Sequence, residues 1–158
     1  MQTTEAVSEY EHERGKPAPS KLHGFTQSVL IALLMQHRDR YTLFSGLTLE
    51  LDGWQVTPDL SLYPKMSIDF TRDEIRMTEP PLLAVEIASP TQGVQELVDK
   101  IRRLLEAGVR SCWLVQPMLQ AITVFSGTME PRTYGQGPVQ DPALDLEIAV
   151  EDVFQSQQ

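Results

Sequence analysis

Two acidic residues and one lysine have the types and surroundings that metal-assisted chemistry requires. Glu86 lies near the end of the apolar run at residues 82–88, where an ionised carboxylate is costly unless it is paired or bound to a cation. Asp59 follows Pro58 at an expected bend between strands. Lys100 lies about 80–90° from the centre of the apolar stripe of an expected helix, so its stem can follow that face and bring the ammonium to the edge of a sheet.

These three groups together could bind a divalent cation and act on a phosphodiester. Two carboxylates from adjacent strands can hold a hard cation such as Mg²⁺ through oxygen ligands, and the ion can activate a water and neutralise phosphate charge. A nearby lysine can orient that water or stabilise the transition state. Each residue also has a structural interpretation: a salt bridge for Glu86, a turn or helix cap for Asp59 and a solvated side chain for Lys100. The residues alone therefore indicate a metal site without excluding these roles.

A helix and a hairpin in the first half of the chain would position Asp59. Ser20 is a typical N-cap for a helix that ends near residues 37–40. The apolar positions at helical spacing are Phe25, Val29 and Leu33, with Leu30 and Leu34 beside them. Alternating apolar residues on both sides of Asp52-Gly53 predict a hairpin, and Pro58 marks a bend or an edge position in its return strand.

The second half of the chain would position Glu86 and Lys100. Residues 82–88 are apolar on both faces and predict a central strand. Residues 93–107 have helical spacing, Gly108 is a typical C-terminal stop, and the turn at residues 89–91 could cap this helix. A final pair of strands is expected at residues 111–116 and 120–126. This order of elements predicts an α/β fold with a mixed sheet flanked by an N-terminal helix and a helix between the core strands.

The composition is that of an ordinary soluble globular protein. With 158 residues, of which 41% are apolar and 22% charged, we expect one domain over residues 1–158, with residues 1–12 and 155–158 loosely ordered. No apolar stretch reaches the roughly 20 residues of a membrane span, and the N-terminus lacks a secretory pattern, so a cytoplasmic location is expected. The single cysteine, Cys112, is expected to be a buried thiol and excludes an internal disulfide.

The net charge of −9 argues against tight, non-specific binding to nucleic acid. Six of the 22 acidic residues but only one of the 13 basic residues lie at positions 130–158, so the remainder of the chain is closer to neutral. Binding to DNA would require the basic residues to gather near the site. The candidates are Arg14, Lys16 and Lys21 before the first helix, with Arg102 and Arg103 beside Lys100 on the later one.

Several motifs, taken together, resemble the Uma2 family, formerly DUF820. They are Pro58-Asp59, Glu86-Ile87-Ala88-Ser89-Pro90, Lys100, Ala107-Gly108-Val109 and Trp113-Leu114-Val115. They are similar to the family's PD strand, E-V-x-S-P strand, lysine-bearing helix, glycine turn and W-x-V strand. Upstream, Tyr10-Glu11, Glu13-Arg14-Gly15 and His23 resemble its N-terminal signature. The resemblance therefore extends over nearly the whole chain.

The resemblance implies a restriction endonuclease-like fold of the PD-(D/E)xK superfamily. It implies catalytic roles for Asp59, Glu86 and Lys100, with the two acids as ligands of Mg²⁺ or Mn²⁺. Glu13 and His23 are further candidates from the N-terminal signature, although Glu11 is an alternative to Glu13 and His23 could be an ordinary helix residue. Ala88 occupies the position that holds lysine in the general superfamily pattern, so the resemblance assigns that role to Lys100 on the following helix.

We therefore expect a Mg²⁺-dependent endonuclease that hydrolyses DNA phosphodiester bonds with a metal-activated water and no covalent intermediate. Two alternatives remain open. The first is a catalytically inactive member that acts as a binding or assembly module, and the second is a phosphodiesterase for RNA or nucleotides. No membrane partner is expected, and the sequence leaves open whether the chain forms a homodimer.

Overall fold

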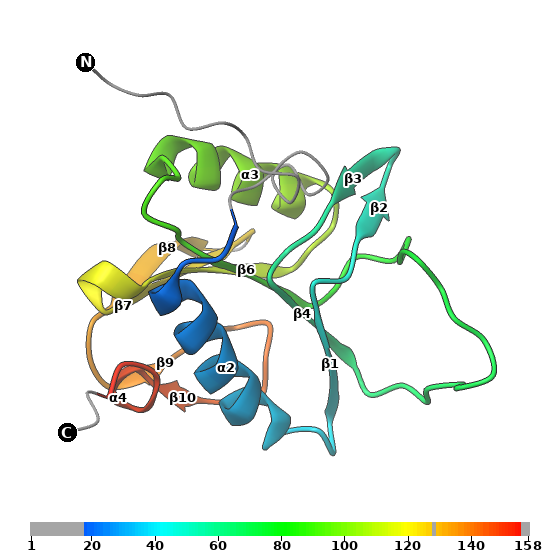
Figure 1. The fold of residues 1–158 in the computed structure, drawn as a ribbon, viewed down its shortest axis with the longest axis horizontal. Helices are drawn as coiled ribbons and strands as arrows, with labels where there is room; N and C mark the ends of the chain where they lie inside the picture. Colours follow the sequence, from blue (N-terminus) through cyan, green and yellow to red (C-terminus); the bar gives the residue numbers. More distant parts are fainter. Residues whose placement is uncertain (1–17, 128, 156–158) are drawn as a thin grey trace.

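A six-stranded mixed sheet forms the centre of the fold, which a computed structural model describes for residues 18–127 and 129–155 (Figure 1). The strand order is β1-β4-β5-β6-β7-β8. Its strands are β1 (Tyr41–Ser45), β4 (Leu60–Pro64), β5 (Leu83–Ile87), β6 (Ser111–Gln116), β7 (Ala121–Ser126) and β8 (Met129–Tyr134). In this sheet β5 and β6 are parallel, and the other neighbouring pairs are antiparallel. The predicted α/β architecture with a mixed sheet is confirmed.

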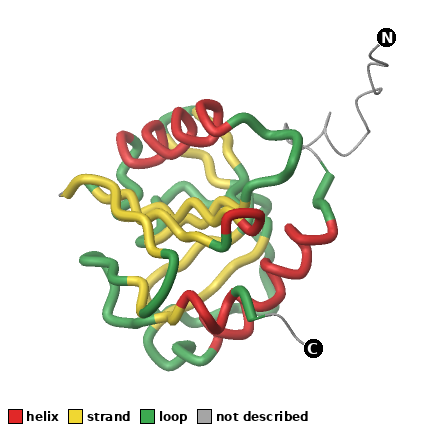
Figure 2. The backbone as a smooth tube through the Cα atoms, turned by 90° about the vertical axis from the view of Figure 1, so that its left-hand side faces the viewer, coloured by secondary structure: helices red, strands yellow, loops and turns green. Residues whose placement is uncertain are grey.

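Helices cover both faces of this sheet, which gives three layers (Figure 2). The first face is covered by α2 (Lys21–Met35) and the short α4 (Val150–Val153), with the two-stranded ribbon of β9 (Pro138–Val139) and β10 (Ile148–Ala149) beside them. The second face is covered by α3 (Val94–Glu106) and the hairpin of β2 (Leu49–Leu51) and β3 (Trp54–Val56). A short 3-10 turn, η1 (Pro117–Leu119), joins β6 to β7. No helix among the described residues is long and apolar enough to cross a membrane.

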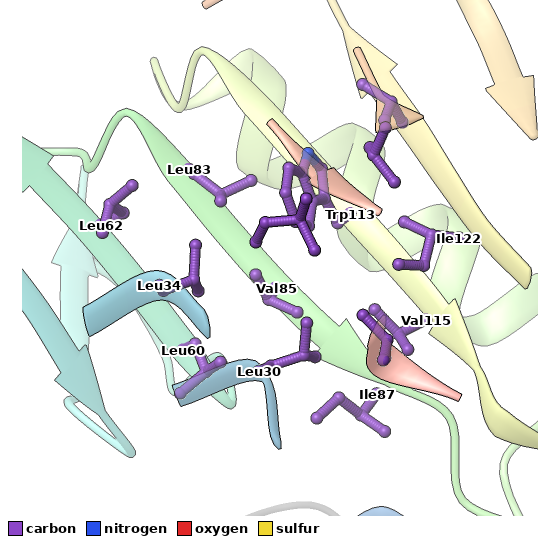
Figure 3. Packing of buried hydrophobic residues seen from close by; sticks show 14 of the residues in the cluster. Leu30, Leu34, Leu60, Leu62, Leu83, Val85, Ile87, Trp113, Val115 and Ile122 are labelled. Carbon is purple, nitrogen blue, oxygen red and sulfur yellow. The ribbon is translucent and has the colours of Figure 1, made fainter. Parts of the chain in front are cut away.

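The core on the first face joins α2 to the central strands. Figure 3 shows Leu30 and Leu34 of α2 packed over Leu60 of β4 and Val85 of β5. All four side chains are 2% exposed or less, and each fully buried side chain of this size contributes about 1.5–3 kcal/mol. The helix begins as predicted, because the Ser20 side chain accepts a hydrogen bond from a backbone N–H of its first turn.

The buried face of α2 differs from the expected one. The residues that it buries are His23, Thr26, Leu30 and Leu34, whereas Phe25 is 49% exposed. The helix is apolar on several sides, so apolar spacing alone did not determine which side faces the sheet. Its α-helical part also ends at Met35, and residues 36–40 form turns instead of the predicted further helical turn.

The core on the second face joins α3 to the hairpin and the sheet. Leu97, Ile101 and Leu104 of α3 are almost completely buried against residues that include Leu49 and Leu51 of the hairpin. The turn at Asp52-Gly53 has positive φ at both residues, as a two-residue hairpin requires. The N-cap of α3 is Gly93, without a side-chain cap, so the expected capping by residues 89–91 is wrong. Gly108 ends the helix as predicted, with a φ of 103°.

A long loop at residues 65–82 connects β4 to β5 and passes beside β2 of the hairpin. Backbone hydrogen bonds tie Met77 to Thr48 and Glu50 beside β2. Elsewhere in the loop apolar side chains are exposed, among them Ile68 at 48% and Ile75 at 81%. The loop returns the chain to β5, which carries Glu86 and pairs with β4, the strand that begins directly after Asp59.

Candidate active site

Asp59 and Glu86 lie at neighbouring ends of two paired strands. Leu60, the first residue of β4, pairs with Val85 of β5, so the residue before it, Asp59, reaches the level of Glu86. Two hydrogen bonds fix this position: the Asp59 N–H donates to the Val85 carbonyl at 3.1 Å, and the Ile87 N–H donates to Asp59 Oδ2 at 2.8 Å. The Asp59 carboxylate therefore lies against the peptide that links Glu86 to Ile87.

His23 of α2 contacts the same carboxylate. Its Nε2 lies 3.1 Å from Asp59 Oδ2, and both residues are almost fully buried, with exposures of 5% for His23 and 4% for Asp59. The position of His23 follows from the helix start, because its backbone N–H donates to the capping Ser20 Oγ at 3.2 Å. The structure thus brings His23 into contact with Asp59, whereas the sequence left it open between a site residue and an ordinary helix residue.

Gln27 extends the polar contacts of α2 with this part of the chain. Its Nε2 donates to the Asp59 carbonyl at 3.3 Å, and the Gly46 N–H donates to the same oxygen at 3.0 Å. A buried carbonyl and carboxylate require such partners, because an unsatisfied polar group in the interior costs about 1–3 kcal/mol. Asp59 is held by groups from α2, β5 and the end of β1.

Glu86 and Lys100 form an ion pair on the second face of the sheet. Lys100 Nζ lies 2.8 Å from Glu86 Oε1, and their side chains are 22% and 2% exposed, respectively. Glu86 alternates along β5 with Val85 and Ile87, whose side chains belong to the core on the first face, so its own side chain points toward α3. The pairing explains how a carboxylate is accommodated in a buried strand, since a buried charge requires a partner.

The site therefore consists of two pairs, His23–Asp59 and Glu86–Lys100. Their residues come from α2, β5, α3 and the bend directly before β4. Ile87 adds a backbone N–H that sequence reasoning missed. No residue type could have revealed it, because every residue except proline carries that donor.

Two carboxylates are a donor set of the kind that Mg²⁺ uses in proteins. Among residues 18–127 and 129–155, no group of three or more His, Cys, Asp or Glu side chains could hold a metal ion. Mg²⁺ does not require such a group, because proteins commonly bind it through one or two carboxylates while waters and substrate oxygens complete its shell. Asp59 and Glu86 supply two carboxylates from adjacent strand ends, which is the number of carboxylates that this mode of binding uses.

The basic residues expected to contact DNA have different surroundings. Lys21 and Arg102 are exposed, at the start of α2 and on α3. The guanidinium of Arg103 lies 4.2 Å from the centre of the Trp54 ring, so it packs on the hairpin as a cation–π contact. Glu13 and Lys16 lie outside the described residues, as do Arg14 and Glu11.

A second buried carboxylate, Asp141, belongs to the scaffold. Its Oδ2 accepts hydrogen bonds from Trp113 Nε1 at 2.7 Å and from the Ser111 hydroxyl, while Oδ1 accepts one from the Ala143 N–H at 2.9 Å. Three donors satisfy this acid and attach the loop after β9 to β6.

Cys112, also in β6, is fully buried as predicted. Burial raises the pKa of its thiol well above the usual range, which leaves it unreactive.

Comparisons with known proteins agree with this architecture. Residues 9–155 match the model of the Uma2 family, described as "Putative restriction endonuclease". Among solved structures, a protein from Anabaena variabilis described as "a putative nuclease belonging to DUF820" has 23% sequence identity and a TM-score of 0.73, over 88% of this chain and 83% of that chain. At this identity the likeness shows the fold, which is consistent with the predicted restriction endonuclease-like fold. No curated protein matches.

Proposed function

The chain belongs to the Uma2 family, and from this premise we propose that it is a Mg²⁺-dependent endonuclease that hydrolyses phosphodiester bonds in DNA. The observation that carries the proposal is the placement of Asp59 directly before β4 at the level of Glu86 in the paired strand β5. Lys100 lies 2.8 Å from Glu86, and the Ile87 N–H donates to the Asp59 carboxylate. Two acids and a lysine are the groups that this chemistry needs.

Asp59 and Glu86 would hold the metal ion. When bound, Mg²⁺, or Mn²⁺ in its place, would neutralise phosphate charge and make a water more acidic. His23 and the Ile87 N–H orient Asp59, since both contact Oδ2 and thereby fix the direction in which the carboxylate can bind. Outer contacts of this kind are what keep a metal ligand in place.

Lys100 would act on the phosphate. In the present arrangement its ammonium balances Glu86 at 2.8 Å, and its partial exposure allows it to reach an oxygen of a bound phosphodiester. A cation in that position stabilises the negative charge that builds up on the phosphate in the transition state. This role does not require the lysine to follow Glu86 by two residues, where the chain has Ala88.

Lys21 and Arg102 would contribute contacts to the DNA backbone, with Lys16 as a further candidate before α2. Such contacts place the strand without reading its sequence, and their number is small for a chain of net charge −9. Binding should therefore be weak and should fall as salt rises, because each phosphate contact releases counterions.

A cleavage assay with matched variants tests the proposal. Wild-type protein should cleave DNA with Mg²⁺ or Mn²⁺ and should be inactive with EDTA, while Lys100→Met should reduce kcat by about 100-fold or more. The control is Arg110→Met, which removes an exposed positive charge. Arg110 lies just before the N-terminal end of β6, whereas Glu86 lies near the C-terminal end of the parallel strand β5. This variant should retain full activity. RNA and a dinucleotide are tested in parallel, since cleavage of these but not DNA would favour a different phosphodiesterase.

Absence of cleavage on every substrate would reject the enzyme and favour a non-catalytic binding module. Circular dichroism of each variant excludes loss of folding as the cause of lost activity.

A further inference from the structure

A small apolar pocket opens beside the candidate active site. It has a volume of about 160 Å³ and lies between the start of α2, the segment from β5 to α3, and η1. Its apolar lining includes Leu22, Pro90, Val94, Leu97, Pro117 and Met118. The side chains at its mouth are exposed, with Leu22 at 43% and Met118 at 78%, so the pocket is accessible from solvent.

The pocket shares three elements with the site. Leu22 precedes His23 on α2, Ala88 follows Glu86 by two residues, and Leu97 lies one helical turn before Lys100 on α3. Lining residues of the pocket are therefore one to three positions along the chain from His23, Glu86 and Lys100. This position favours a ligand that belongs to the same molecule as the phosphate at the site.

The size and chemistry of the pocket suit one nucleobase. An apolar cavity of about 150 Å³ takes up a benzene molecule, so this space is right for a single planar ring group. A base also has a polar edge that needs donors and acceptors. Gln92 and Gln116 line the same pocket, and their side-chain amides offer both.

The negative charge of the protein means that binding to a nucleic acid would need contacts other than those to phosphates. A chain of net charge −9 gains little affinity from the phosphate backbone. Shelter of a base on apolar side chains would supply affinity that does not depend on basic residues, because removal of apolar surface from water is favourable whatever the charge of the protein.

We propose that this pocket binds one unpaired nucleobase of the strand whose phosphodiester lies at Asp59 and Glu86. This inference rests on the proposed nuclease function and specifies its substrate: single-stranded DNA, or duplex DNA with a locally unpaired nucleotide. A base in an intact duplex is stacked and paired, so it must be extruded before it can enter the pocket. Intact duplex is therefore the poorer ligand.

Binding without metal tests the pocket. Fluorescence anisotropy in EDTA compares a labelled single strand of about 12 nucleotides, its intact duplex, and a series of single strands in which one nucleotide at a time is abasic. The single strand should bind about tenfold tighter than the duplex, and one abasic position should weaken binding about tenfold, the change that corresponds to loss of about 55 Å² of sheltered apolar surface. Equal binding of single strand and duplex, or no sensitive position in the series, would overturn the inference.

A pair of matched variants locates the effect. Leu22→Ala/Met118→Ala shortens two exposed apolar side chains at the pocket, and Ile68→Ala/Ile75→Ala does the same on the loop at residues 65–82. In the pocket variant the abasic strand should bind as well as the intact one, because the two changes remove the same contact. The loop variant should keep the tenfold difference, and loss of that difference in both variants would overturn the assignment to the pocket.

Hydrolysis of bis(p-nitrophenyl) phosphate with Mg²⁺ separates this inference from the proposed function. That diester carries no nucleobase, so its hydrolysis by the wild-type protein reports the phosphate chemistry alone. Hydrolysis without any abasic effect would reject the base pocket and keep the nuclease. An abasic effect without hydrolysis of any diester would keep the pocket as a base-binding site and reject the nuclease.

Discussion

Lys100 Nζ and Glu86 Oε1 lie 2.8 Å apart, but the two side chains have unequal access to water, at 22% and 2% exposure. This inequality means that the two halves of the pair do not respond alike to substitution. The lysine can keep part of its hydration when its partner is changed, whereas the carboxylate stays buried in β5 whatever replaces the lysine.

We expect Lys100→Met to destabilise the protein more than Glu86→Gln. Removing the ammonium leaves the Glu86 carboxylate in the interior without this cation, which costs about 3 kcal/mol. Glu86→Gln removes the buried charge itself and should change the free energy of unfolding by less than about 1 kcal/mol, since Lys100 is partly hydrated. Urea unfolding of the two variants measures the difference. A larger loss in Glu86→Gln would show that Glu86 has a structural role.

Mg²⁺ should stabilise the wild-type protein through Asp59. At a concentration about ten times its Kd, a ligand that binds only the folded state raises the free energy of unfolding by ~1.4 kcal/mol. The shift in Tm on adding Mg²⁺ should therefore disappear in Asp59→Asn. It should persist in Asp39→Asn, an exposed acid in the turn after α2. Equal shifts in both variants would place the metal elsewhere.

Asp141 should affect stability and not chemistry. Asp141→Ala removes the acceptor for the Trp113 indole and the Ser111 hydroxyl, and leaving these donors unsatisfied costs about 3 kcal/mol in total. A double-mutant cycle with Trp113→Phe, followed by urea unfolding, should show that the two changes are not additive. DNA cleavage per folded molecule should remain at the wild-type level, and a loss of kcat would connect Asp141 to the site.

The stability of the protein should fall between about pH 10 and pH 12. Burial, with a smaller contribution from Glu79, raises the pKa of Tyr63 to about 12. The unfolded chain releases this proton near its usual pKa of about 10 while the folded protein retains it, so stability decreases as pH rises through this window. Tyr63→Phe loses the hydrogen bond to the Glu79 carbonyl but should show a shallower decrease. An unchanged slope in urea titrations of Tyr63→Phe would attribute the decrease to other groups.

The salt dependence of DNA binding should identify the phosphate contacts. Lys21→Ala and Arg102→Ala should each reduce the slope of log K against log salt by about 1 and weaken binding to all sequences alike. Arg103→Ala should change the slope less, because its guanidinium already packs on Trp54. A full reduction in Arg103→Ala would show that it leaves the ring to reach the DNA.

The sequence predicted the elements that carry Glu86 and Lys100 because both signals were strong. An acid in a fully apolar run has few explanations, and the apolar stripe of α3 is sharply one-sided, so the position of Lys100 relative to that stripe could be read directly. The burial of His23 could not be derived in this way. It depends on the Asp59 carboxylate, which comes from a distant strand, and apolar spacing favours Phe25 over a polar residue.

The C-terminal elements were missed for a different reason. β8 is an edge strand whose residues include Glu130, Pro131 and Arg132, and such a segment lacks the alternation of a half-buried strand. The ribbon of β9 and β10 has two residues in each strand, which is too short for any periodicity. β9 and β10 form because Val139 and Ile148 are buried against the core. This is a tertiary effect that the local sequence does not contain.

The two pairs at the site are also joined to the chain in different ways. Glu86 and Lys100 belong to one continuous β5-α3-β6 unit, whereas His23 and Asp59 connect α2 to the start of β4. Proteins open in contiguous segments well below their global unfolding energy. A transient detachment of α2 would therefore release Asp59 from His23 and leave Glu86 with Lys100, so amide hydrogen exchange in α2, more than in α3, should report how often the site is incomplete.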